Sequence, residues 1–187
     1  MKNKIFYILF SLATIFCKAQ IISLDQISQC ENGNCPNYNS VKDTNNRLNK
    51  FSGIWKGTYT DGRLYEFQFI KKTDFSLYGG KKWDMLIGKI MIKSTNGVIV
   101  ESSINSSDDN THFNGLEFDK ALIKYQMYYS GNAECNDKGY VYISFPDPNN
   151  LNQMKLVFIQ DMDIVSKCPD GYKTVMHDGK ALILTKQ

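Results

Sequence analysis

Apolar and polar residues alternate along most of the chain after residue 50. In residues 64–70, Tyr65, Phe67 and Phe69 share one side, with polar residues between them. Alternation with a period of two is typical of a β-strand that buries one face. Similar apolar patterns, most of them alternating, occur in residues 51–59, 83–93, 98–104, 120–129, 139–145, 154–160 and 180–186.

Turn signals separate these segments. Asp61-Gly62 and Asn96-Gly97 each lie between two apolar stretches, and such pairs supply the positive φ angles that tight hairpins need. Residues 105–115 form a polar stretch that predicts a loop, and residues 116–118 predict a short strand. With no long helical pattern, the sequence predicts an all-β fold, an antiparallel up-and-down barrel of about eight strands. A β-sandwich is the alternative.

The N-terminus has the layout of a secretory signal peptide, which we assign to residues 1–19. Two lysines precede an apolar run over residues 5–16, and small residues stand three and one positions before Gln20. The run is shorter than the roughly 20 residues that span a bilayer. We therefore predict cleavage before Gln20 and a secreted or periplasmic protein with no transmembrane segment in the mature chain. Residues 20–50 then form an irregular extension, and residues 51–187 the barrel domain.

The charge balance changes once this leader is removed. The full chain has 22 basic and 19 acidic residues, and the leader contains three lysines and no acid. The mature chain is therefore formally neutral. Proteins that bind nucleic acids need a cationic surface, so a nucleic-acid partner is not expected.

Four cysteines remain after the leader, and an even number in an exported chain indicates disulfides. Four cysteines allow three pairings, of which we favour Cys30–Cys35 and Cys135–Cys168. A zinc site is the alternative, but it calls for close pairs such as C-x2-C, and the close pair here is C-x4-C. We therefore expect no metal ion and no cofactor.

The stretch FSGIWKGTY, residues 51–59, resembles the first strand of calycin-type barrels, which include lipocalins, fatty-acid-binding proteins and avidins. The resemblance implies that Trp55 plugs one end of the barrel, that Gly53 permits close packing there, and that a ligand enters at the other end. A plain core tryptophan is the other interpretation. Lipocalins stack an arginine from the last strand on this ring, and this chain offers Lys180 or Lys186 instead. The leader and composition also resemble small secreted proteins of Bacteroidota.

Aromatic side chains are the remaining functional signal, because ligand pockets are mostly apolar with a few polar groups. We predict an exported, non-catalytic protein that binds a small apolar ligand. Its alternative is an envelope or extracellular protein–protein interaction module with a filled core. An enzyme is the third hypothesis, which a buried pair of acids would favour. The predicted ligand-binding residues are Tyr65, Phe67, Phe69, Tyr125, Tyr129 and Tyr140.

Overall fold

The structure is a computed structural model that describes residues 21–30, 34–76, 80–163, 168–172 and 174–187. The predicted signal peptide lies outside these residues. Strands dominate the described chain, and no helix in it is both long and apolar enough to cross a membrane. The elements are β1 (Ile21–Ser23), α2 (Leu24–Ile27), β2 (Ser40–Lys42), η2 (Arg47–Lys50), β3 (Gly53–Thr58), β4 (Leu64–Phe75), β5 (Lys82–Lys93), β6 (Ile99–Ser102), η3 (Asp108–Asn110), β7 (Phe113–Phe118), β8 (Tyr125–Ser130), η4 (Ala133–Cys135), β9 (Lys138–Ser144), β10 (Gln153–Gln160) and β11 (Ala181–Lys186).

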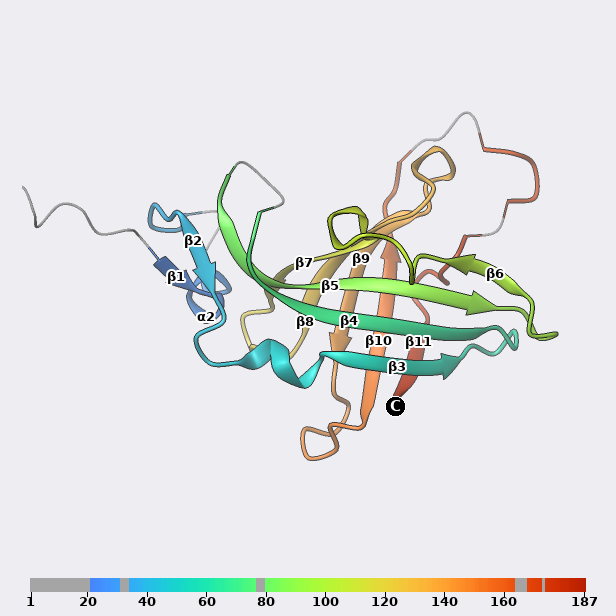
Figure 1. Cartoon of the computed structure of the whole chain (residues 1–187), viewed down its shortest axis with the longest axis horizontal. Coiled ribbons are helices and arrows are strands. Elements are labelled where there is room, and N and C mark those ends of the chain that lie inside the picture. Colours follow the sequence, from blue (N-terminus) through green and yellow to red (C-terminus); the bar gives the residue numbers. More distant parts are fainter. Residues whose placement is uncertain (1–20, 31–33, 77–79, 164–167, 173) are drawn as a thin grey trace, which may run out of the picture.

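Eight of these strands close into an antiparallel barrel (Figure 1). The strands β3, β4, β5, β7, β8, β9, β10 and β11 pair in chain order. The last strand then pairs with the first, with Thr185 opposite Lys56 and Lys186 opposite Trp55. The predicted up-and-down barrel is thereby confirmed, and its architecture is compatible with a calycin-type fold.

The long strand β5 joins the barrel to its additional strands. One edge of β5 pairs with β4. Along the other edge it pairs successively with β2, β7 and β6. The contact with β7 is short, with Ile87 opposite Asn114 and Gly88 opposite Phe113. A side chain at Gly88 would crowd Phe113 and Phe69, so glycine is what permits the barrel to close at this point.

Aromatic side chains fill the barrel interior. The burial pattern of β4 alternates, as the sequence predicts, and Tyr65, Phe67 and Phe69 are almost completely buried. The Phe67 ring centroid lies 5.7 Å from those of both Phe69 and Phe113. Such ring contacts stabilise the core beyond simple area burial.

Trp55 lies at the end of the barrel where β9 and β11 terminate. It is fully buried, and its indole N–H donates a 2.8 Å hydrogen bond to the Phe51 carbonyl. Of the two candidate lysines, Lys186 places its ammonium 5.2 Å from the Trp55 ring centroid. Gly53 has a φ of 129°, and an added Cβ would lie 3.1 Å from the Lys186 Cε. Glycine at position 53 therefore lets the lysine approach; that Trp55 acts as a plug stays a prediction.

The segment predicted as an irregular extension contains β1, α2, β2 and η2, which pack at one end of the barrel (Figure 1). Ser23 and Gln26 form a reciprocal capping box at the start of α2. Leu24, Ile27 and Val41 are buried against the barrel. Apolar burial thus holds the extension to the barrel, although its composition is rich in polar residues.

Both predicted disulfides are confirmed, and they lie at opposite ends of the barrel. Cys30–Cys35 closes a loop of the extension. Cys135–Cys168 joins the β8–β9 connection to the segment that follows β10. Two described residues farther along that segment cover the barrel end: Met176 is fully buried, and the Tyr65 hydroxyl donates a 2.7 Å hydrogen bond to the Val175 carbonyl.

Candidate functional site

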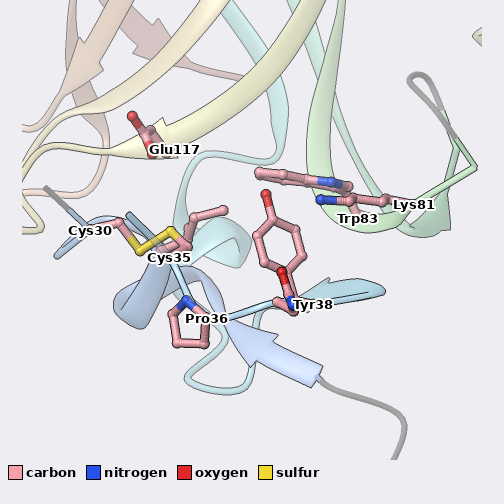
Figure 2. A pocket seen from close by; sticks show the side chains of 9 residues that line it. Cys30, Cys35, Pro36, Tyr38, Lys81, Trp83 and Glu117 are labelled. Carbon is pink, nitrogen blue, oxygen red and sulfur yellow. A yellow bond between two sulfur atoms is a disulfide. The ribbon is translucent and has the colours of Figure 1, made fainter. Parts of the chain in front are cut away.

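A pocket of about 410 Å³ lies between the extension and the barrel (Figure 2). Its walls come from three separate parts of the chain: the extension, the start of β5, and β7. The lining residues are Ile27, Cys30, Cys35, Pro36, Asn37, Tyr38, Lys81, Trp83 and Glu117. The volume falls in the range of roughly 300–1,000 Å³ that is usual for small-molecule sites.

Hydrogen bonds fix the extension on both strands that line the pocket. Strand β2 pairs in parallel with β5, which sets Val41 opposite Trp83. The Ser28 hydroxyl accepts a 3.2 Å hydrogen bond from the Phe118 amide at the end of β7. The Asp84 carboxylate accepts a 3.0 Å hydrogen bond from the Asp43 amide. With the Cys30–Cys35 disulfide, these contacts make the pocket a preformed feature of the fold.

One wall of the pocket is aromatic. The rings of Tyr38 and Trp83 meet edge to face, with centroids 6.2 Å apart, and both are partly exposed. The Lys81 ammonium lies 4.0 Å from the Tyr38 ring centroid, a cation–π geometry. Figure 2 shows these three side chains together on one side, away from the disulfide. Flat apolar groups can pack against such a wall.

Glu117 supplies a carboxyl group across the pocket from this wall (Figure 2). It projects from β7 and is half-buried, and this burial raises the pKa of its carboxyl group. Within the described part of the chain, no hydrogen bond or ion pair engages this carboxyl. Burying an ionised carboxylate costs free energy of folding unless a hydrogen-bond donor or a cation pairs with it. Glu117 is therefore free to bind a donor or a cation that enters the pocket.

The predicted ligand-binding residues lie elsewhere. Five of them come together in the barrel interior, where each is buried: Tyr65, Phe67, Phe69, Tyr125 and Tyr129. Tyr140 does not join them, because alternation along β9 buries its neighbour Val141 and leaves Tyr140 39% exposed on the outer face. There its ring contacts that of Tyr128 at 5.4 Å. None of the six lines the pocket of Figure 2.

A second cluster of titratable groups lies at the other end of the barrel. Asp137 is fully buried, and its Oδ2 accepts hydrogen bonds from the Val175 amide (3.1 Å) and the Tyr172 hydroxyl (3.0 Å). Burial raises the pKa of Asp137, and the nearby Glu101 carboxylate raises it further, against the lowering effect of these hydrogen bonds. Among the described residues, Asp137 Oδ1 has no hydrogen-bond partner. These contacts attach the segment after β10 to the barrel.

The histidines contact other groups. His177 Nε2 lies 2.8 Å from Asp61 Oδ2 and 2.7 Å from Arg63 Nη2, and His112 stacks on Tyr129. Among the described residues, no group of three or more His, Cys, Asp or Glu side chains is arranged to hold a metal ion.

Comparison with known proteins gives a family match. No curated protein and no solved structure matches the chain. A protein family described as "Family of unknown function (DUF6705)" matches residues 1–177, which is nearly the whole length. The chain therefore belongs to the DUF6705 family.

Proposed function

We propose that this protein is an exported, non-catalytic binding protein for a small molecule, and that the ligand sits between the extension and the barrel. The observation that carries the proposal is the pocket that Tyr38 and Trp83 line opposite Glu117. An aromatic wall with a few polar groups is the usual make-up of a small-molecule site. The sulfurs of Cys30 and Cys35 are oxidised to a disulfide, which leaves no thiol nucleophile at either position.

The packing of the barrel interior favours a site outside it. The interior rings contact one another at ordinary packing distances, as Phe67 does with Phe69 and Phe113. An eight-stranded barrel can fill its own interior with side chains in this way. A ligand among these rings would have to displace buried aromatic groups, whereas the pocket at the extension is already open.

Export is supported by two separate features. The leader pattern of residues 1–19 is that of a secretory signal peptide. The two disulfides, Cys30–Cys35 and Cys135–Cys168, are compatible with an extracytoplasmic location, where thiols are oxidised.

Native mass spectrometry of the oxidised protein, recovered from the periplasm or medium of its own host, tests the proposal. We expect a co-purifying small molecule in the wild type. Its affinity, read as occupancy at subsaturating ligand, should fall at least about fivefold in Trp83→Ala, because aromatic contacts contribute on the order of 1 kcal/mol beyond area burial. Tyr140→Ala, which removes an exposed ring on the outer face, is the matched control and should keep the ligand. A protein free of any ligand, or a ligand that Trp83→Ala retains in full, would contradict the proposal.

A second candidate function, self-association, is favoured by the edge of β6. Val98, Ile99 and Val100 are 65%, 55% and 57% exposed, and β6 pairs only with β5 among the described strands. An antiparallel pairing of two copies centred on Ile99 would place these apolar residues opposite one another, which makes the strip self-complementary. Exposed apolar edges are rare in monomeric proteins because they invite pairing.

Light scattering across a concentration series tests this second candidate. We expect the wild type to form a dimer and Ile99→Lys to remain a monomer, since a lysine on the edge disfavours strand pairing. Ile183→Lys alters another exposed isoleucine, on β11, and should leave the dimer intact. A monomeric wild type at every concentration would rule out self-association through this edge.

A further inference from the structure

We infer that the pocket selects an organic cation, an amine that carries a flat apolar group. The inference rests on the proposed function and names the ligand class of the same site. It requires that Glu117 contact the ammonium group and that the apolar group lie against Trp83 and Tyr38.

The state of Glu117 favours a cationic ligand. Its carboxyl group lines the pocket and is half-buried, and no group in the described chain pairs with it. The cause of its raised pKa is burial, and no ion pair with a described cation offsets it. Other acids at this end of the barrel have a partner within the described chain, for example Asp25 with Arg47 at 2.6 Å. An entering cation would therefore complete the pairing at Glu117.

The aromatic wall opposite the carboxyl also favours a cation. The faces of Trp and Tyr rings attract cations through their quadrupole, and Trp does so most strongly. Lys81 already makes such a cation–π contact, with its ammonium 4.0 Å from the Tyr38 ring centroid. Trp83 makes an edge contact with Tyr38 and is engaged by no cation that the structure describes. A flat amine can therefore pack on the indole while its charge reaches Glu117.

The size and charge of the pocket favour a small ligand that is not an anion. A volume of about 410 Å³ suits a small molecule and is too small for a folded partner. An anionic ligand would bring a second negative charge beside a half-buried carboxylate, which is unfavourable in a medium of low polarity. The exposed Lys81 lies on the aromatic side rather than beside Glu117 (Figure 2).

Calorimetric titration with two matched probes tests the inference. The probes are 2-phenylethylamine and its neutral analogue 2-phenylethanol, which share the same ring and chain length. We expect the amine to bind the oxidised wild-type protein about tenfold more tightly or better, the margin of a charge-assisted hydrogen bond. Glu117→Gln should abolish this preference without weakening the binding of the alcohol. Glu66→Gln, which alters a partly buried acid paired with Lys56 on β3, is the control and should keep the preference.

The outcomes separate the inference from the proposed function. Equal affinity for the two probes, or a preference that Glu117→Gln retains, would overturn the amine assignment and leave a small-molecule site. Binding of neither probe by a protein that co-purifies with a ligand would also overturn the amine assignment alone. Binding of neither probe by a protein without any co-purified ligand would overturn both. Thermal unfolding of Glu117→Gln close to that of the wild type confirms that the variant is folded.

Discussion

At the scale of single residues, Asp137 shows how one buried carboxyl can attach a long connection to the barrel. Its Oδ2 accepts hydrogen bonds from the Val175 amide and the Tyr172 hydroxyl, while its Oδ1 has no hydrogen-bond partner in the described part of the chain. Burying such an acid opposes its ionisation, and the nearby Glu101 adds to the effect. The same side chain is therefore both an anchor and a source of pH-dependent stability.

We predict that replacing Asp137 by asparagine removes part of the pH dependence of folding. The pKa of Asp137 is raised in the folded protein, so the folded state binds this proton more tightly than the unfolded chain does. The stabilisation is fully present below the ordinary Asp pKa of about 3.9, and it is lost as pH rises through the raised value. Asparagine cannot ionise, so the free energy of unfolding of Asp137→Asn should decline less over this window in urea titrations. Asp170→Asn, at an exposed position, should behave as the wild type, and an unchanged slope in Asp137→Asn would contradict the prediction.

At the scale of secondary-structure elements, regular alternation predicts the strands well. Residues 64–70 and 154–160 both lie within observed strands, β4 and β10, because one face of each packs on the core. The pattern in 120–129 overstates its strand: β8 begins only at Tyr125. The preceding residues form a turn instead, in which the Asp119 carboxylate accepts hydrogen bonds from two backbone amides and Leu122 takes a φ of 57°.

Strand β7 is the element that the sequence pattern misses most clearly. Its first residues, Phe113 to Gly115, fall in the predicted polar loop of 105–115, so that part of the prediction is wrong. Gly115 weakens the strand signal, but an added Cβ there would clash with the Tyr125 hydroxyl and the Leu86 backbone. The close approach of the neighbouring strands at this position requires glycine. This requirement can be recognised only when the pairing of the strands is known.

The candidate site is not predicted by the sequence either, because it also depends on strand pairing. Tyr38, Trp83 and Glu117 are far apart in the sequence, and they meet because β2 pairs with β5 at the edge that also carries β7. Nothing in a three-residue strand such as β2 indicates which partner it takes. The C-x4-C loop next to Tyr38 was the available signal, since a disulfide there fixes one wall of the pocket.

At the scale of the whole molecule, the two disulfides lie at opposite ends of the barrel and have different roles. Cys30–Cys35 spans a sequence separation of 5 and belongs to the pocket wall. Cys135–Cys168 spans a separation of 33 and lies at the opposite end, where it joins the β8–β9 connection to the segment after β10. A cross-link stabilises a protein mainly by restricting the unfolded chain, and the effect increases with the length of the closed loop.

We therefore expect the loss of one disulfide to affect mainly the stability of the fold and the loss of the other to affect mainly ligand binding. Replacing both Cys135 and Cys168 by alanine should lower the free energy of unfolding by about 4 kcal/mol, against about 2 kcal/mol for Cys30 and Cys35, from loop entropy. Ligand affinity should respond in the opposite order, because only Cys30 and Cys35 line the pocket. Urea unfolding and calorimetric titration of both double variants measure the two quantities. If both variants lost affinity equally, binding would depend on the stability of the barrel as a whole, and a local site between the extension and the barrel would no longer explain it.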